Sequence, residues 1–225
     1  QDNVCYILGC GPSVLDANKD RLVKEMENNL CFSIKLIYFS FDDLVDFHFF
    51  NCNNYKQYPY NSKTFHISQS DFCSEETSQM NVWGSQIYDL NVQVPRQTKS
   101  QTLTNTRNFE SWTFEKSGVL RPWGPGIMYE SVLFFAYHLG CKEIRTIGWD
   151  YKDPSNKEPI QHFYDEKYRT SKLKNPAAQP YGAEISESIK LSADWSIFLE
   201  QNNIKLKCFD SDKCKIDNKV ERYTI

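Results

Sequence analysis

The sequence has no apolar run long enough to cross a membrane, and its first residues show no signal-peptide pattern. It also lacks an excess of basic residues: the formal net charge is −3, so no positive field points to nucleic acid as a partner. None of its eight cysteines forms a CxxC pair, which argues against a zinc site and against a disulfide framework. We therefore expect reduced thiols in a cytoplasmic protein, which would meet the inner face of a membrane only through parts outside this chain.

The sequence does contain enough apolar material for a core. Of its 225 residues, 40% are hydrophobic and 24% are charged, which is typical of a globular protein. No internal repeat and no convincing linker divides the chain. We therefore expect a single domain over residues 1–225, while its oligomeric state stays open.

Apolar runs alternate with helical patterns along most of the chain. This alternation predicts an α/β fold with a Rossmann-like, doubly wound, mostly parallel sheet. The expected strands are 4–9, 30–36, 46–51, 63–68, 143–149 and 204–209, and the expected helices are 14–28, 126–139 and 185–201.

Two irregular stretches interrupt this alternation. Residues 69–122 are rich in Ser, Thr, Asn and Gln, contain Trp83, Phe109 and Trp112, and show no clean period. Such a long irregular stretch in a compact domain is usually functional or disordered. We interpret it as a lid or acceptor-binding segment, with a surface excursion as the alternative. Residues 152–183 form a second excursion.

The most informative motif is a glycine turn that follows the first strand, with Gly9, Cys10, Gly11 and Ser13 around Pro12. Glycines let the backbone approach a ligand closely, and the N–H groups at the start of a helix attract phosphate. The turn therefore predicts an anion site, although an ordinary strand-to-helix turn has the same letters.

Ligands of open α/β sheets bind outside the carboxyl ends of the strands, and this rule selects further candidates. The turn with Pro125 and Gly126 precedes a helix and is a second candidate phosphate site, and Asn51 ends a strand where it can bond a sugar or base. Asp150 and Tyr151 follow another strand, although helix capping also explains an acid there. Lys35 interrupts an apolar run, where it either neutralises a phosphate or marks a strand edge.

One histidine stands out as a candidate for chemistry. His162 lies in the second irregular stretch, two residues before Tyr164, and loops beyond a strand end are where a titratable imidazole is useful. It is a candidate general base or a donor to a leaving phosphate, with an inert surface histidine as the alternative. No DxD pair has a suitable strand context, so we expect neither a metal nor another cofactor.

Three segments resemble the bacterial sialyltransferases of glycosyltransferase family 42 and the related domain of the flagellin-modifying Maf proteins. They are ILGCGPS at residues 7–13, the run from Gly126 through LGCKEI to GWDY at 148–151, and FLE with IKLKC at 198–208. Together they cover about a third of the chain. The implied fold is the Rossmann-like, sialyltransferase variant of the GT-A architecture.

The resemblance implies a metal-independent, inverting transfer from a CMP-sialic acid donor. A base takes the proton of the acceptor hydroxyl while tyrosines hydrogen-bond the departing phosphate. Donor contacts are implied at Gly9, Gly11, Asn51, Pro125 and Gly126.

The chain departs from the family at several of its functional positions. Cys10 and Lys35 each stand where the family has a donor-binding asparagine, and Gly124-Pro125 replaces a Thr-Ser pair. The catalytic histidine of the family has no counterpart in residues 183–188, where this chain has Glu184 and Glu187. We therefore expect His162 or one of these two glutamates to act as the base, with His162 or Tyr164 on the phosphate.

The sequence thus predicts a transferase that moves sialic acid, or a related nonulosonate, from a nucleotide donor to a surface-glycan acceptor. Two alternatives remain open. One is a Mg²⁺-dependent pyrophosphokinase that uses Asp42, Asp43 and Asp150, and the other is a non-catalytic module that binds a nucleotide or a glycan.

Overall fold

The predicted α/β fold is confirmed: the protein has a Rossmann-like parallel sheet with helices on both faces. The computed structural model describes residues 3–51, 61–69, 87–89, 91–93, 109–115, 127–151, 153–155, 162–163 and 182–225.

The main sheet has eight strands in the order β10-β9-β8-β1-β2-β3-β4-β5, and every neighbouring pair is parallel. The strands are β1 (Val4–Leu8), β2 (Leu30–Ile34), β3 (Phe47–Asn51), β4 (Phe65–Gln69), β5 (Ile87–Asp89), β8 (Glu143–Ile147), β9 (Lys205–Phe209) and β10 (Glu221–Tyr223). A second, antiparallel sheet pairs β6 (Asn91–Gln93) with β7 (Thr113–Glu115).

The order of the strands creates a switch point beside β1. From β1 the chain builds the sheet outward to β5, and it then returns to place β8, β9 and β10 on the other side of β1. Ligands of open α/β sheets bind in the crevice outside the carboxyl ends of the strands at such a point. The fold therefore places the candidate site at the carboxyl ends of β1, β2 and β8.

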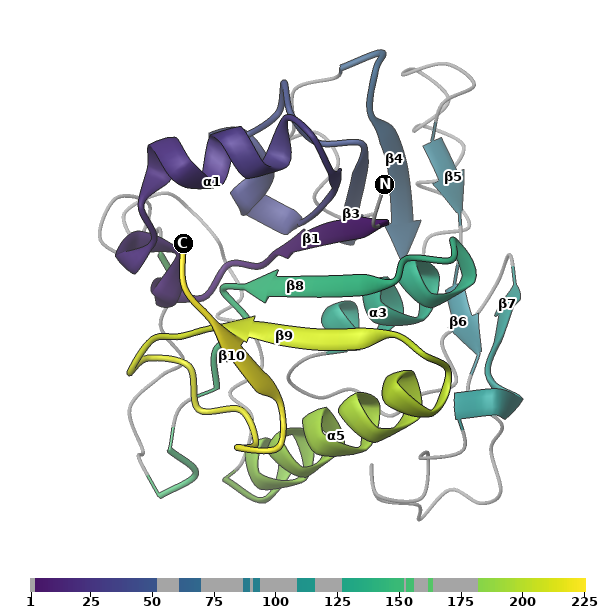
Figure 1. The fold of residues 1–225 in the computed structure, drawn as a ribbon. Helices are drawn as coiled ribbons and strands as arrows, with labels where there is room; N and C mark the ends of the chain where they lie inside the picture. The colour runs from purple at the N-terminus through teal and green to yellow at the C-terminus, as the bar shows by residue number, and fades with distance from the viewer. Residues whose placement is uncertain are drawn as a thin grey trace, which may run out of the picture.

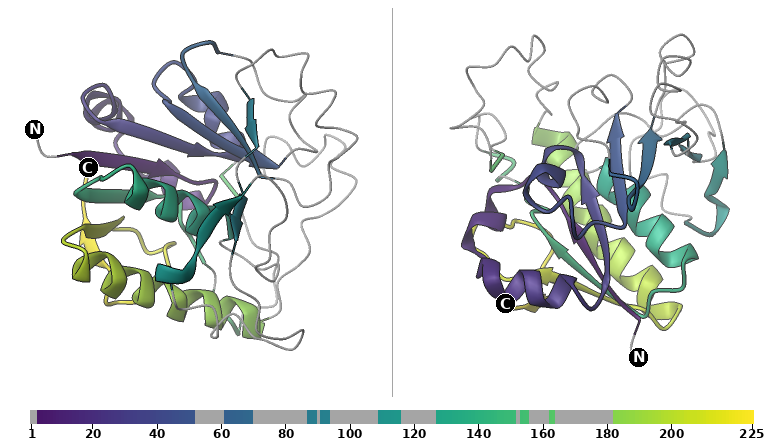
Figure 2. Two further views of the ribbon diagram at one scale, coloured as in Figure 1. Left: turned by 90° about the vertical axis from the view of Figure 1, so that its right-hand side faces the viewer. Right: turned by 90° about the horizontal axis from the view of Figure 1, so that it is seen from above.

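Helices cover the sheet in two layers, which Figures 1 and 2 show from three directions. One face carries α1 (Lys19–Met26) and the 3₁₀ helix η2 (Lys35–Ser40), and the other carries α3 (Ile127–His138) and α5 (Gly182–Gln201). Alternate residues of β1 face the two layers: Tyr6 and Leu8 pack with the α1 layer, whereas Cys5 and Ile7 pack with the α3 layer.

The helix expected at 14–28 is in fact two helices. The 3₁₀ helix η1 (Pro12–Asp16) comes first, and α1 starts anew because Asn18 caps it, its side-chain oxygen accepting a hydrogen bond from the Arg21 N–H (3.1 Å). The strand expected at 30–36 ends early, at Ile34, because Lys35 has a φ of 55° and turns the chain into η2. Strand β10 was not predicted.

Two aromatic residues of the irregular stretch 69–122 pack into the protein. Phe109, in the 3₁₀ helix η6 (Phe109–Ser111), and Trp112 are 3% and 4% exposed. Phe109 stacks on Trp195 of α5 with 4.0 Å between the ring centroids. These two residues are therefore part of the core, and Trp83 lies outside the described residues.

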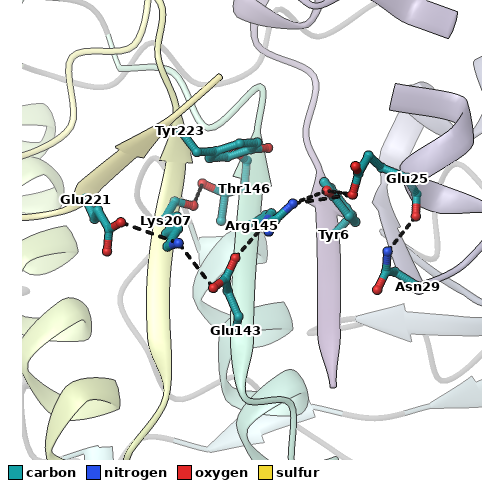
Figure 3. Close-up of polar contacts among 9 residues, drawn as sticks. All are labelled: Tyr6, Glu25, Asn29, Glu143, Arg145, Thr146, Lys207, Glu221 and Tyr223. Atoms are coloured by element: carbon teal, nitrogen blue, oxygen red, sulfur yellow. Dashed lines mark hydrogen bonds and ion pairs between the residues drawn. The ribbon is translucent and has the colours of Figure 1, made fainter. Parts of the chain in front are cut away.

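A chain of charged side chains crosses the α1 face of the sheet, near the amino ends of β8 and β9 (Figure 3). Glu143 accepts a hydrogen bond from Arg145 (2.6 Å) and pairs with Lys207 (3.2 Å). Arg145 also donates to the Tyr6 hydroxyl (2.6 Å) and lies over the rings of Tyr6 and Tyr223. The network connects four neighbouring strands, β1, β8, β9 and β10, away from the carboxyl edge.

Candidate functional site

The turns after β1 and β8 are joined by backbone hydrogen bonds at the switch point. The Gly9 N–H donates to the Ile147 carbonyl (2.8 Å), and the Gly11 N–H donates to the Gly148 carbonyl (2.9 Å). Two segments that are far apart in the sequence thus meet at one edge of the sheet.

Asp150 closes the first turn. Its two carboxylate oxygens accept hydrogen bonds from the Ser13 N–H (2.6 Å) and the Ser13 hydroxyl (2.7 Å). The Ser13 hydroxyl in turn accepts a hydrogen bond from the Gly148 N–H (3.1 Å). Burial raises the pKa of Asp150, and this outweighs the opposing effect of the Ser13 donors. Of the two roles considered for Asp150, the capping role is the one that this geometry displays.

The expectation that the N–H groups of this turn face an incoming phosphate is therefore wrong for three of them. Those of Gly9 and Gly11 donate to backbone carbonyls, and that of Ser13 donates to a carboxylate. An anion at this turn would have to displace the carboxylate of the protein itself.

Interior packing accounts for the glycines of both turns. A Cβ on Gly9 would collide with the hydroxyl end of Tyr129, and a Cβ on Gly11 would collide with the Asp150 carboxylate. Gly148 has a φ of 72°, a conformation that other residues adopt only with strain. The glycine pattern thus has a cause inside the protein, independent of any ligand.

Behind the turns, aromatic side chains form a buried stack. The Tyr129 hydroxyl donates to the Ile147 carbonyl (2.6 Å), and its ring stacks on Trp149 with centroids 5.1 Å apart. The Trp149 indole N–H donates to the Tyr151 hydroxyl (3.1 Å). Tyr151 is 3% exposed and belongs to the core on the α3 side, so its ring packs behind the edge rather than across it.

The side chain of Cys10 points from the turn toward the end of β2. Its thiol donates to the Ile34 carbonyl (3.1 Å), and burial raises the pKa of Cys10 to about 11. The thiol is therefore protonated at neutral pH, and it fills the space between the first turn and the start of η2.

Lys35 lies next to this thiol at the carboxyl end of β2. It is half-buried, and burial lowers the pKa of its ammonium group. Within the described part of the chain Lys35 makes no ion pair, and the one neighbour that affects its pKa is Cys10. A cation in a strained backbone conformation beside the switch point, without a carboxylate partner there, is suited to hold an anion.

The segment that carries His162 contacts the same turn. The N–H of Phe163 donates to the Cys10 carbonyl (2.9 Å), and His162 is half-buried. The structure thus places the backbone of His162 beside the glycine turn. Tyr164 lies outside the described residues.

The remaining predicted positions are placed only in part. Asn51 ends β3, and Glu184 and Glu187 lie in the first turns of α5, but the side chains of all three fall outside what the structure describes. Because α5 leads directly into β9 and runs antiparallel to it, its first turns lie at the carboxyl edge (Figure 1). Pro125 and Gly126 lie outside the described residues.

Two further histidines, His48 and His66, fall within the expected strands 46–51 and 63–68, a position that is typical of packed core or edge residues. His48 on β3 and His66 on β4 are indeed buried, and a ring nitrogen of His48 contacts the Lys35 carbonyl (3.2 Å). The available signal was the alternation of the two strands, which places both imidazoles on the η2 face.

The fold and the edge define an α/β protein with a Rossmann-like sheet and a candidate anion site at its switch point. The chain matches no protein-family model, no curated protein and no solved structure. Within the described residues, no helix has both the length and the apolar character needed to span a bilayer. Nor does this part of the chain group three His, Cys, Asp or Glu side chains as a metal site would require.

Proposed function

We propose that the protein is a metal-independent, inverting glycosyltransferase that binds a nucleotide-activated sugar at the carboxyl ends of β1, β2 and β8. The observation that carries the proposal is Lys35, a half-buried cation at the end of β2 with no ion pair among the described residues. A phosphate group supplies the charge that Lys35 lacks, and the switch point of an α/β sheet is where such ligands bind.

The phosphate would lie toward Lys35 and the Cys10 backbone rather than in the centre of the glycine turn. Ser13 is already engaged by Asp150, so the first turn contributes shape and rigidity more than hydrogen-bond donors. This location also lies next to His162, through the bond from Phe163 to Cys10.

The chemistry requires one displacement at the anomeric carbon. A base removes the proton from the acceptor hydroxyl, the hydroxyl oxygen attacks the sugar, and the nucleotide phosphate leaves with growing negative charge. Lys35 stabilises that charge, and His162 or Tyr164 donates a hydrogen bond to the phosphate. His162, Glu184 or Glu187 serves as the base.

The first-choice donor is CMP-linked sialic acid or another nonulosonate, because the segments at 7–13 and 126–151 resemble sialyltransferases that use it. The acceptor would be a surface glycan that is modified on the cytoplasmic side, where the donor and the reduced thiols are found.

A second candidate is a module that binds a nucleotide or a glycan without turnover. The observation in its favour is that the glycines at positions 9 and 11 are explained by packing and that both Ser13 donors are occupied. The Mg²⁺-dependent pyrophosphokinase has weaker support, because the two oxygens of Asp150 are engaged by Ser13 and are not directed at a shared metal.

Release of CMP from CMP-sialic acid, followed in EDTA, separates these candidates. The transferase predicts turnover without added metal, and His162→Ala should slow it by roughly 10²-fold while the protein stays folded. Binding of CMP without release would favour the non-catalytic module. Transfer of pyrophosphate from ATP that appears only with Mg²⁺ would favour the kinase-like alternative.

A further inference from the structure

Two buried cysteines lie with their sulfur atoms in contact at the carboxyl end of β9. Cys208 on β9 and Cys214 in the loop that leads to β10 are 1% and 4% exposed, and both are free thiols. They are six positions apart in the sequence, and their Sγ atoms are 3.2 Å apart. The sulfur atoms of a disulfide are about 2.05 Å apart, so this pair needs little further movement to form the bond.

The hydrogen of the Cys214 thiol is directed away from Cys208. It forms a hydrogen bond with the carbonyl oxygen of Trp149, with 3.3 Å between the sulfur and the oxygen. Because a thiol has a single hydrogen, Cys208 is the donor in the contact between the two sulfurs and Cys214 is the acceptor. A hydrogen bond of this direction stabilises negative charge on the acceptor, so Cys214 is the thiol that ionises more readily.

The charges around the pair act in the same direction. The hydrogen bond from Cys208 lowers the pKa of Cys214, burial and the charge of Asp150 oppose this, and the charge of Arg222 adds to the lowering. The same contact between the thiols raises the pKa of Cys208, and burial raises it further. The thiolate is the nucleophilic form of cysteine, so the two thiols are not equivalent and Cys214 is the more reactive one.

Arg222 is placed to support a thiolate. It lies on β10 in register with Cys208, and its Nη2 atom donates to the Ile216 carbonyl (3.3 Å). Its Nη1 atom is buried and has no hydrogen-bond partner within the part of the chain that the structure describes. A buried donor without an acceptor is costly, and a thiolate at Cys214 supplies negative charge beside this guanidinium.

The more reactive sulfur lies in a loop rather than in the sheet. Residues 210–220 connect β9 to β10 without a helix or strand, and the side chains of Lys213 and Lys215, on both sides of Cys214, are exposed. Segments held by turns and surface contacts open at a lower cost in free energy than central strands do. A small oxidant therefore reaches Cys214 by local opening of the loop, while Cys208 stays in β9.

We propose that Cys208 and Cys214 are a site of reversible disulfide formation, with a hydroperoxide as the oxidant and Cys214 as the sulfur that reacts first. The Cys214 thiolate attacks one oxygen of the hydroperoxide and the O–O bond breaks. This gives a sulfenic acid and an alcohol, or water from hydrogen peroxide, which takes up the proton of Cys214. The Cys208 sulfur then attacks the sulfenic sulfur, the S–O bond breaks, and hydroxide leaves with the proton of Cys208 as water. Two thiols lose two electrons, and one hydroperoxide gains them.

The disulfide would change the contacts of the turn after β8. Cys214 then has no hydrogen, so the Trp149 carbonyl loses its donor. The same loop contacts η1, because the Ser211 hydroxyl donates to the Asp16 carboxylate (2.6 Å) and Lys213 pairs with it. The oxidation state of the pair should therefore alter the backbone amide signals of this turn. The proposal does not depend on what binds at the candidate site.

Lys213 makes the product easy to recognise, because trypsin cleaves after Lys207, Lys213 and Lys215 and so separates the two cysteines into peptides 208–213 and 214–215. The folded wild-type protein is treated with an equimolar amount of hydrogen peroxide, its remaining thiols are alkylated in denaturant, and the tryptic digest is weighed without reductant. We expect the two peptides to be joined by a disulfide, and treatment with dithiothreitol before alkylation to separate them. Two alkylated peptides, with oxidation at Cys10 or another cysteine instead, would overturn the proposal.

Variants test the order of the two steps. Cys208→Ser keeps a hydrogen-bond donor beside Cys214 but removes the second thiol, so peroxide should leave a sulfenic acid on Cys214 that dimedone traps. In Cys214→Ser, oxidation of Cys208 should be about tenfold or more slower than formation of the disulfide in the wild type. Equal rates of oxidation in these two variants would contradict the assignment of Cys214 as the sulfur that reacts first.

The role of the guanidinium has its own matched pair of variants. Arg222→Met should slow the oxidation of Cys214, and Arg222→Lys, which keeps the positive charge, should restore part of the rate. Lys219→Met is the control, because it removes an exposed positive charge from the same loop and should leave the rate unchanged. An equal loss of rate in Arg222→Met and Lys219→Met would show that Arg222 does not act on the thiol directly.

Discussion

Asp150 accepts both of the hydrogen bonds that Ser13 can donate, although the two residues are 137 positions apart in the sequence. One carboxylate thereby fixes the turn after β1 to the turn after β8, at the point where the order of strand addition reverses. The relationship also sets where a ligand phosphate can lie, since the negative charge of Asp150 already occupies the donors of Ser13. The candidate anion site is therefore displaced toward Lys35.

Removing this carboxylate should destabilise the junction. In Asp150→Ala, the N–H and the hydroxyl of Ser13 lose their acceptor in a largely buried place, and we expect unfolding in urea to require about 1–3 kcal/mol less free energy. Asp150→Asn keeps one acceptor oxygen and should lose less. Equal stability of Asp150→Ala and the wild-type protein would show that the junction does not depend on this contact.

The stability of the junction should also depend on pH. Burial raises the pKa of Asp150 in the folded protein, so the folded state holds this proton more tightly than the unfolded chain does. The resulting stabilisation is complete below the pKa that Asp150 has in the unfolded chain, about 3.9. It is lost as the pH rises through the higher pKa that Asp150 has in the folded protein. The free energy of unfolding of the wild type, relative to Asp150→Asn, should therefore fall as the pH rises above about 4. A difference that grows with pH would contradict this.

Glu143 should show the opposite dependence. Burial opposes its ionisation, but Arg145 and Lys207 outweigh burial and lower its pKa (Figure 3). The contribution of Glu143 to stability is complete above the pKa that it has in the unfolded chain, about 4.3. It is lost as the pH falls through the lower pKa that Glu143 has in the folded protein. Glu143→Gln should cost about 1 kcal/mol at neutral pH, and the cost should disappear in acid.

Glu221→Gln provides the matched control for Glu143. Glu221 also pairs with Lys207 (3.4 Å), but its side chain is 60% exposed, so we expect a change below about 0.5 kcal/mol. If the two variants behave alike in denaturant melts across the pH range, the network in Figure 3 does not stabilise the sheet through Glu143.

The packing of Tyr129 against Gly9 is open to a double-mutant test. A Cβ on Gly9 would collide with the Tyr129 ring, and we expect Gly9→Ala to cost about 1–3 kcal/mol. In a Tyr129→Ala background this cost should shrink. Gly140→Ala is the control: its Cβ meets nothing within 4 Å, so its cost comes from its φ of 77° alone and should not depend on Tyr129. An unchanged cost of Gly9→Ala in both backgrounds would reject steric contact as the reason for the glycine.

The protein should be more stable with glycine at position 35 than with lysine. Its φ of 55° is strained for a residue with a side chain, and its ammonium group is half-buried. Lys35→Gly should therefore raise the free energy of unfolding by about 1 kcal/mol and abolish anion binding. Stabilisation together with loss of binding is the signature of strain retained at a functional site.

Asn203 is the control for this trade-off, because it has nearly the same φ, 59°, at the end of α5. Asparagine tolerates this conformation, so Asn203→Gly should gain only a few tenths of a kcal/mol and leave binding unchanged. If Lys35→Gly instead destabilised the protein, the Lys35 side chain would have a structural role that its contacts do not indicate.

The sheet was predictable from the sequence where apolar runs are long. Strands β1 and β8 lie within the expected ranges. Strand β1 is a continuous apolar run, as is typical of a buried parallel strand, whereas β8 mixes Ile144 and Ile147 with the charged Glu143 and Arg145. Strand β10 consists of Glu221, Arg222 and Tyr223, which carry no such pattern, and it forms by pairing with β9. The division of the first helix depends on the cap at Asn18, a local signal that the helical period obscured.

The candidate site was predictable in position but not in its internal bonding. The strand ends pointed to Gly9 and Asp150, and the rule for α/β sheets brings such residues together. Lys35 was singled out only as a cation that interrupts an apolar run. No sequence pattern indicates that the Asp150 carboxylate is directed at Ser13, because that depends on how two distant turns meet. The contact of His48 with His66 likewise depends on the register of β3 and β4.

The central claim is that Lys35 holds a nucleotide phosphate at the carboxyl edge, and calorimetric titration of CMP in EDTA tests it most directly. The wild-type protein should bind CMP, Lys35→Met should bind it about tenfold or more weakly, and Lys205→Met, which removes an exposed lysine at the opposite end of β9, should bind it as the wild type does. Equal affinity in Lys35→Met and the wild type, or no binding of CMP by any of the three proteins, would contradict the claim.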